Sequence, residues 1–452
     1  MTETLIRNSD NLGRAIRWIN GAKSAAIVYN DPMPKHPLGT GSGSVVFYAD
    51  NSPQNTEIPL SKNAHERRMS LLRLLSQKTL CERLYVWDLH SFMLRAYIPT
   101  AGIKKLQSNI VDLSFLMAWT GRQDMSQEEL LDCYKVQSLA ALGDKLMREL
   151  PSDAMRYHND YWKPMLLSFV PREMKPIEVV GTDGIRRSQY VHYVFAQGVT
   201  SRISARGGNF SNDSDFFGVH NFPKSQRART IVAREGWKIV WIDMKSADVR
   251  TIASLARDKQ LMGCLSDGKC PYKQVSEEVN LGSITRDVAK RLTLAFFYGG
   301  VPSQLAKREN VSSADASKTY AVAHKLYGAT IKWAEDVAKD KEGFTRTGRL
   351  FWAGKASEAR RKLPNHITQS TTADICNSIY ATYLHKCSTR PNRSIPILFL
   401  HDEFVFEVNE MYLEEEIEFL REIGETNPLI SFGLEDLDLR VNIKYGDSWR
   451  DG

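Results

Sequence analysis

The sequence predicts a mixed α/β protein, and three observations lead to that prediction. The 452-residue chain is 42% hydrophobic and 25% charged, which is ordinary for a globular protein of roughly two to four domains. Short apolar, β-prone segments alternate with helical ones over the first 122 residues. Farther along, two apolar strands end in aspartate residues, and a helix between them carries a regular row of cations.

The first part of the chain, residues 1–122, is predicted to be a compact α/β unit. Its predicted strands lie at 24–29, 44–49 and 83–89, and its predicted helices at 65–77 and 109–121. Residues 126–149 are predicted to form one helix with Ser126 as its N-cap. This helix would belong to a small helical module that extends through Pro171.

The overall charge and the cysteines narrow the protein class only slightly. Lys and Arg number 60 against 53 Asp and Glu, and the net charge of +7 weakly favours a polyanionic partner. The six cysteines form no CxxC pair, which argues against a structural zinc site and suits a reducing compartment. Neither a signal-peptide pattern nor a membrane-length apolar run is visible, so we expect a cytoplasmic protein with no membrane contact.

Two predicted strands each place an aspartate at a strand end. The apolar segment KIVWI leads into Asp243, and a later strand, turn and strand carry His401, Asp402 and Glu403 in the turn. Two aspartates at adjacent strand ends can hold two divalent ions about 4 Å apart for phosphoryl transfer. Taken singly, each aspartate is more often a turn or cap residue.

A predicted helix between these strands carries Arg286, Lys290, Leu294 and Tyr298 at steps of four. Each step rotates about 40° around the axis, so the four side chains share one face. Two cations, an apolar side chain and a tyrosine in a row suit a nucleotide, with its triphosphate beside the cations. The alternative is a solvated basic stripe beside a core helix.

Together these segments resemble the family A DNA polymerases, the bacterial DNA polymerase I group, over roughly residues 190–452. The resemblance implies a right-hand polymerase with palm, fingers and a short thumb, in which Asp243 and Asp402 bind metal. Glu403 and Lys290 are implied as further catalytic residues. The implied nucleotide-binding residues are Arg286, Lys290, Leu294, Tyr298 and Asp248.

The same resemblance implies a set of DNA contacts. They are Arg202 and Asn221 before the first carboxylate strand, Arg349 in a TxxGR element, Arg361, Asn365 and Gln369 at steps of four, and His401 in the turn. Pro364 lies inside the series of three, and proline disrupts a helix interior. We therefore expect the helix that carries Asn365 and Gln369 to start at Pro364.

Three positions depart from the family pattern. Asp248 stands where the family usually has Glu, Leu294 where it has Phe or Tyr, and Ala295 where it has Gly. No metal ligand is lost by these changes. Leu294 brings the helix closer to the related single-subunit RNA polymerases, whereas the His-Asp-Glu turn favours the DNA polymerase branch.

The resemblance also suggests a domain organisation. Residues 1–122 would form a degenerate 3′-5′ exonuclease-like domain of RNase H-like type. An active site of this kind needs an Asp-x-Glu on the first strand to bind metal, but Met33 stands two residues after Asp31 in place of the Glu. A later strand offers only Asp88. Residues 123–178 would be a reduced thumb, 179–250 and 346–452 the palm, and 251–345 the fingers.

The implied activity is template-directed extension of a primer 3′-hydroxyl with dNTPs, without proofreading. Two Mg²⁺ ions are implied as cofactors, with Mn²⁺ as a possible substitute, and primer–template DNA and dNTPs as partners. A polymerase this compact would suit phage or plasmid replication, or repair. Two alternatives stay open: a primer-making or RNA polymerase that accepts rNTPs, and a catalytically inactive nucleic-acid-binding subunit.

Overall fold

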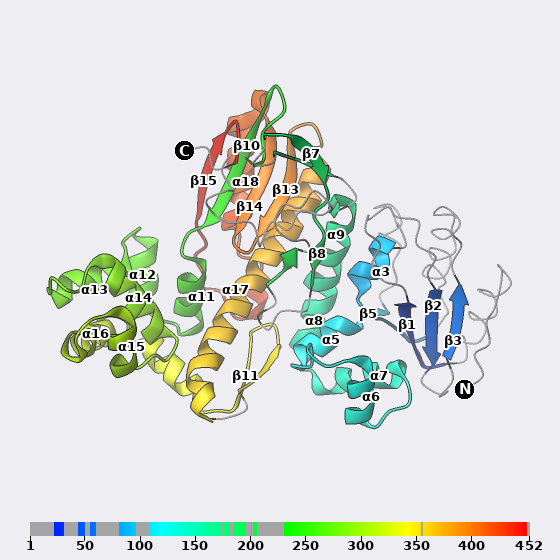
Figure 1. Cartoon of the computed structure of the whole chain (residues 1–452), viewed down its shortest axis with the longest axis horizontal. Helices are drawn as coiled ribbons and strands as arrows, with labels where there is room; N and C mark the ends of the chain where they lie inside the picture. The colour runs from blue at the N-terminus through cyan, green and yellow to red at the C-terminus, as the bar shows by residue number, and fades with distance from the viewer. Residues whose placement is uncertain are drawn as a thin grey trace. The chain divides into compact units, whose positions relative to one another are not determined.

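The computed structural model describes residues 22–30, 44–49, 55–59, 81–95, 109–173, 176–180, 184–195, 200, 202–205, 230–353 and 356–449. Over these residues helices and sheets are both present, so the predicted mixed α/β class is confirmed (Figure 1). The chain divides into two compact units. The first comprises 1–243, 377–423 and 443–452, and the second comprises 244–376 and 424–442.

The N-terminal part of the first unit contains a five-stranded sheet in the order β3-β2-β1-β4-β5. Its strands are β1 (Ser24–Asn30), β2 (Ser44–Ala49), β3 (Asn55–Pro59), β4 (Arg83–Val86) and β5 (Ile110–Asp112). The β1–β2 and β2–β3 pairs are antiparallel, whereas β1–β4 and β4–β5 are parallel. The sequence therefore located β1 and β2 correctly, and the helix predicted at 65–77 lies outside the described residues.

Two boundaries in this region were predicted wrongly. The predicted strand 83–89 stops at Val86, because helix α3 (Leu89–Arg95) begins just after it. The predicted helix 109–121 is instead the short strand β5 followed by helix α5 (Leu113–Trp119). Asp112 separates the two, since its side chain accepts the backbone N–H of Ser114 and so starts the helix.

A helical segment follows the sheet. It consists of α6 (Gln127–Tyr134), α7 (Leu139–Glu149), α8 (Ser152–Tyr157), the π-helical turn η1 (His158–Trp162) and α9 (Lys163–Glu173). Ser126 caps α6 as predicted, in a reciprocal capping box with Glu129. The single helix predicted over 126–149 is two helices, because Lys135 adopts a left-handed conformation with φ of 52°.

The first unit also contains a four-stranded antiparallel sheet, in the order β13-β14-β10-β15, which carries the candidate site (Figure 1). Its strands are β10 (Trp237–Met244), β13 (Ser394–Leu400), β14 (Glu403–Asn409) and β15 (Val441–Gly446). Residues of β13 and β14 are almost all buried, including Phe404, Val405 and Phe406 at 0% exposure. The turn η3 (Glu410–Tyr412) and helix α18 (Leu413–Glu425) follow β14 and precede β15. Two small ladders, β6 (Ile177–Val180) with β7 (Arg186–Gln189) and β8 (Tyr193–Val194) with β9 (Ser204–Ala205), precede it.

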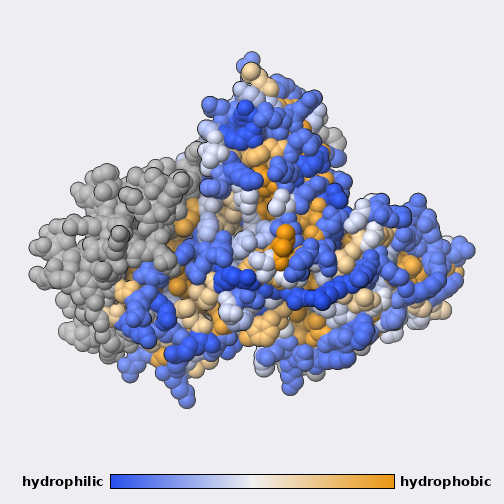
Figure 2. Space-filling view, turned by 180° about the vertical axis from the view of Figure 1, so that it is seen from behind, coloured by the Kyte–Doolittle hydropathy of each residue, from blue (hydrophilic) through white to orange (hydrophobic). Residues whose placement is uncertain are grey.

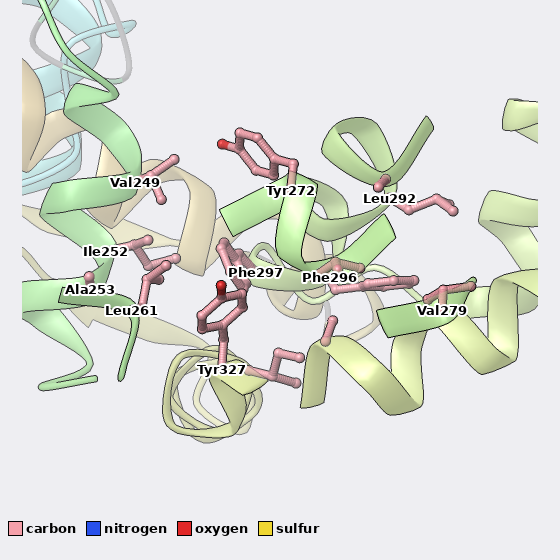
Figure 3. Packing of buried hydrophobic residues seen from close by; sticks show 14 of the residues in the cluster. Val249, Ile252, Ala253, Leu261, Tyr272, Val279, Leu292, Phe296, Phe297 and Tyr327 are labelled. Carbon is pink, nitrogen blue, oxygen red and sulfur yellow. The ribbon is translucent and has the colours of Figure 1, made fainter. Parts of the chain in front are cut away.

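The second unit is built mainly from helices packed into one bundle. They are α11 (Ala247–Leu255), α12 (Lys259–Ser266), α13 (Pro271–Val279), α14 (Arg286–Phe297), α15 (Pro302–Glu309) and α16 (Ser313–Val337). Figure 3 shows Phe296 and Phe297 of α14 among the buried side chains of neighbouring helices. Tyr327 departs from helical geometry inside α16, and its hydroxyl donates to Oε1 of Gln274 at 2.5 Å. This core fixes the rotation of α14 about its axis and so determines which of its faces is exposed.

The remaining elements of the described residues are the hairpin of β11 (Glu342–Phe344) and β12 (Leu350–Trp352), the long helix α17 (Ala356–Ser388) and the turn η4 (Ile430–Phe432). Pro364 lies inside α17, so the expectation that the helix starts at Pro364 is wrong. Within the described part of the chain, no helix is long and apolar enough to cross a membrane. The face shown in Figure 2 is covered largely by hydrophilic residues, with hydrophobic ones in separate patches.

Candidate active site

The carboxylates predicted to bind metal lie at one end of the β10–β14 ladder. Asp243 on β10 is the direct register partner of Glu403 on β14. Leu400 and Glu403 pair across the β13–β14 hairpin, so His401 and Asp402 form its turn. His401 has a positive φ of 58°, the conformation that such a tight turn requires. The antiparallel register therefore brings Asp243 and Asp402 to the same end of the strands, although 158 residues separate them in sequence. This end of the sheet, with Asp243, Asp402 and Glu403, is called the carboxylate edge below.

The three acids at this edge differ in burial. Asp243 is exposed, Asp402 is half-buried, and Glu403 is buried at 5% exposure. Directly opposed residues on neighbouring strands place their side chains on the same face, where two carboxylates repel each other. Such a pair is stabilised by a cation or by hydrogen-bond donors. Glu403 has a donor of this kind, since Nε1–H of Trp449 donates to its Oε1 at 2.8 Å.

The donor chemistry of this edge fits Mg²⁺. Carboxylate oxygens are the ligands that this hard cation prefers, and Mg²⁺ is commonly held by one or two carboxylates together with water and substrate phosphates. Among the described residues, no group of three or more His, Cys, Asp or Glu side chains is arranged to hold a metal alone. A metal site of the predicted kind, with Asp243 and Asp402 as its carboxylates, would leave the other coordination positions to water and phosphate.

The predicted nucleotide-binding face lies on α14. Thr285 caps this helix by accepting the N–H of Val288 at 3.4 Å, and the helix runs from Arg286 to Phe297. Arg286 and Lys290 are exposed, whereas Leu292 and Phe296 on the opposite side are buried. Leu294 is half-buried, and Tyr298 is the C-cap residue just beyond the last turn. Arg286 and Lys290 thus lie on the solvent side of the helix, where Arg286 pairs with Asp287 at 3.2 Å. Leu294 and Tyr298, in contrast, pack against the hydrophobic core of the second unit.

Asp248 lies in the first turn of α11, where its side chain is half-buried. Arg250 fixes this helix start, and sequence reasoning missed it. Its guanidinium donates to the carbonyl oxygens of Lys245 and Leu265 and to the side chain of Asp438, at 2.9–3.0 Å. Burial lowers the pKa of Arg250, while the charge of Asp438 opposes that shift.

The comparisons with known proteins decide the family. The model of DNA polymerase family A matches residues 182–451, more than half of the chain. The chain belongs to DNA polymerase family A. The family predicted from the motifs is therefore confirmed.

Individual relatives are distant. DNA polymerase I of Pseudomonas aeruginosa is 23% identical over 323 residues, which cover 67% of this chain and 33% of that protein. The thermostable DNA polymerase I of Thermus filiformis is 24% identical over 285 residues, 58% of this chain and 33% of that protein. The chain thus spans about a third of the length of these relatives.

A solved structure has the same fold. The POL domain of Pol1 from M. smegmatis, in complex with DNA primer-template and dNTP, superimposes with a TM-score of 0.73 at 15% sequence identity. The match covers 98% of this chain and 99% of that domain.

The predicted DNA contacts of this family A member have mixed settings. His401 is exposed and Arg202 is half-buried. Asn365 and Gln369 lie one turn apart on α17, where Nε2 of Gln369 donates to Oδ1 of Asn365 at 2.9 Å. Arg361 is on the same helix, because α17 runs through Pro364, but its side chain is outside the described set, as is Asn221.

Arg349 is the predicted contact whose setting differs most from expectation. It has 0% exposure, and its guanidinium lies 5.4 Å from the ring centre of Phe351. Its backbone N–H donates to the hydroxyl of Thr345, beside a buried hydrogen bond from Thr347 to Asp374. In this conformation Arg349 has no surface to offer DNA, so its environment favours a structural role within the second unit.

The N-terminal acid considered for an exonuclease site serves a helix start. Asp88 follows β4 with a positive φ of 50°, and its Oδ1 accepts the N–H of Ser91 in α3 at 3.1 Å. Asp112, at the end of the neighbouring parallel strand, caps α5. Asp31 and Met33 lie outside the described residues.

Proposed function

We propose that this chain is a template-directed DNA polymerase that extends a primer 3′-hydroxyl with dNTPs by a two-metal-ion mechanism. The observation that carries the proposal is the register of the β10–β14 ladder, which sets Asp243 opposite Glu403 and beside the Asp402 turn. Family membership over residues 182–451 supports the same activity. Two bound Mg²⁺ ions would supply activation of the primer hydroxyl and stabilisation of the leaving pyrophosphate.

The side chains of the chain itself have separate tasks in this proposal. Asp243 and Asp402 hold the ions and thereby orient the reacting phosphate. Arg286 and Lys290, both exposed on α14, neutralise the triphosphate, and Lys290 donates a proton to the leaving group. Tyr298 stacks near the templating base.

Contacts with primer–template DNA are proposed for Arg202, Asn221, Asn365, Gln369 and His401, and for Arg361. As contacts to the phosphate and sugar backbone, they would position the duplex without reading its base sequence. Arg349 would act indirectly, by shaping the hairpin of β11 and β12.

We further propose the domain assignment expected from the sequence: exonuclease-like 1–122, thumb 123–178, palm 179–250 and 346–452, and fingers 251–345. The order β3-β2-β1-β4-β5, in which β2 alone runs opposite to the other four strands, supports an RNase H-like sheet at the N-terminus. The use of Asp88 and Asp112 as helix caps supports the loss of proofreading there.

Primer extension tests the proposed activity most simply. Purified protein is incubated with a labelled primer–template and Mg²⁺, first with dNTPs and then with rNTPs. Extension with dNTPs alone supports the proposal. Equal extension with rNTPs favours the primer-making or RNA polymerase alternative. That alternative rests on Asp248, which is shorter than the usual Glu, and on the aliphatic Leu294 in place of an aromatic residue. Binding without extension under either condition favours an inactive nucleic-acid-binding subunit.

A further inference from the structure

Trp449 lies in the interior of the first unit, where its indole donates to Glu403 at the sheet end that carries Asp243 and Asp402. Nε1–H reaches Oε1 of Glu403 at 2.8 Å, with Trp449 at 0% and Glu403 at 5% exposure. A buried carboxylate is costly unless its oxygens accept hydrogen bonds. A buried indole likewise needs an acceptor for its N–H. Each side chain therefore restricts the position of the other.

The backbone around Trp449 is also fixed. Its N–H donates to the carbonyl oxygen of Ile231 at 2.8 Å, and the N–H of Ala233 donates to the carbonyl oxygen of Asp447 at 2.9 Å. Between these two bonds, Val232 and Ser448 form an antiparallel bridge. The indole is thus presented to Glu403 from a segment that is held on both sides of Ser448.

Glu403 connects this segment to both predicted metal ligands. It follows Asp402 directly in the chain, and across the ladder it is the register partner of Asp243. A shift in the side chain of Glu403 would displace the turn that carries Asp402 and change the electrostatic environment of Asp243. Groups that hydrogen-bond to residues around metal ligands orient those ligands and are often needed for full metal affinity.

We infer that Trp449 is a positioning residue for the carboxylate edge, acting through its hydrogen bond to Glu403. The inference rests on the proposed two-metal function, because it assigns a task to Trp449 only if Asp243 and Asp402 hold ions. Trp449 touches neither nucleotide nor metal in this assignment. It keeps the turn and the strand end at the separation that the ions need.

The test compares Trp449→Phe with a matched control, Trp162→Phe. The control also removes a buried indole donor from a buried carboxylate, because Nε1–H of Trp162 donates to Oδ2 of Asp112 at 3.0 Å, but it lies on another element of the same unit. Extension rates are measured against Mg²⁺ concentration, together with the KM for dNTP, DNA affinity and thermal stability. For Trp449→Phe we expect the Mg²⁺ concentration at half-maximal rate to rise about 10-fold or more. DNA affinity should not change, and Trp162→Phe should keep the wild-type Mg²⁺ requirement.

A wild-type Mg²⁺ requirement in folded Trp449→Phe would overturn the inference. So would an equal rise in Trp162→Phe, since that would mark a general loss of packing. Glu403→Leu provides the second variant, because it removes the acceptor of the indole N–H. It should raise the Mg²⁺ requirement, and adding Trp449→Phe to it should raise the requirement no further. If Trp449→Phe does not fold, a wild-type requirement in Glu403→Leu overturns the inference. Failure of the proposed function looks different, because wild-type protein would then extend no primer.

Discussion

At the scale of single residues, the position of Asp248 depends on a neighbour that the motif does not include. Asp248 is in the first turn of α11, and Arg250 holds that turn through carbonyl oxygens of Lys245 and Leu265 and through Asp438. Arg250 is 7% exposed, so these bonds are shielded from water. Because this helix start is held rigidly, the space left open beside residue 248 depends mainly on the length of its side chain.

The first prediction concerns selection of the sugar. Asp248 is one methylene shorter than the Glu usual in the family, so we expect Asp248→Glu to increase discrimination against rNTPs by roughly 10-fold, within the range for a small steric group. Insertion rates for a matched dNTP and rNTP, in wild type and variant, measure it. If wild type already rejects the rNTP strongly and the variant keeps the same ratio, Asp248 does not limit the space beside the sugar.

Residue-scale patterns in the sequence indicated the acids of the site but not their surroundings. Asp243 and Asp402 stood out because each follows a strongly apolar strand. Trp449 and Arg250 carried no such signal, since their partners Glu403 and Asp438 are distant in sequence and meet them only in the folded chain. The burial of Arg349 was missed for the same reason.

At the scale of elements, helices α3 and α5, which follow strands of the N-terminal sheet, both begin at the buried carboxyl group of Asp112. Asp112 accepts the N–H of Ser114 in α5, the N–H of Leu89 in α3 and Nε1–H of Trp162. Burial raises the pKa of Asp112 to about 7, the nearby charge of Asp88 adds to the shift, and these hydrogen bonds oppose it. Protonation of this group is therefore coupled to the stability of both helix starts.

The second prediction is a pH dependence of stability. The ordinary pKa of 3.8 applies in the unfolded chain and about 7 in the fold, so the folded state retains the proton more strongly. The contribution of Asp112 is then complete below the unfolded pKa and is lost as pH rises through the folded one. We expect the stability of wild type relative to Asp112→Asn to fall between about pH 4 and 7. Urea unfolding of both proteins across this range measures it, and a constant difference would contradict the raised pKa.

Element types were more predictable than element boundaries. Strands β10 and β14 and helix α14 followed from apolar runs and from the four-residue spacing. The break at Lys135 was missed because no glycine or proline marks it. The helix α17 passes through Pro364, because the buried residues on either side of the proline, such as Leu363 and Ile367, hold it in the fold despite the lost hydrogen bond.

At the scale of the whole molecule, the chain combines a family A polymerase region at residues 182–451 with an N-terminal five-stranded sheet. The solved polymerase domain matches 98% of the chain, so the fold similarity extends beyond the region that the family model matches. The motifs identified the family, but the strand register that joins Asp243 to the Asp402 turn depends on pairing between distant segments, which the sequence does not specify locally.

The third prediction is that the protein has no 3′→5′ exonuclease activity, because Met33 replaces the needed Glu and Asp88 caps a helix. A labelled primer with a mismatched end is incubated with Mg²⁺ in the absence of nucleotides. The primer should keep its length. Shortening that disappears only when Asp31 or Asp88 is replaced would show an active N-terminal nuclease site.

The assignment of Asp243 and Asp402 as metal ligands is the central claim, and primer extension by Asp243→Asn and Asp402→Asn tests it most directly. Each change keeps the size of the side chain but removes a charge on which both ions depend. Extension should fall below detection in both variants, while primer–template binding stays near the wild-type level because Lys and Arg contacts to phosphates are unchanged. Extension at close to the wild-type rate by either variant would contradict the account.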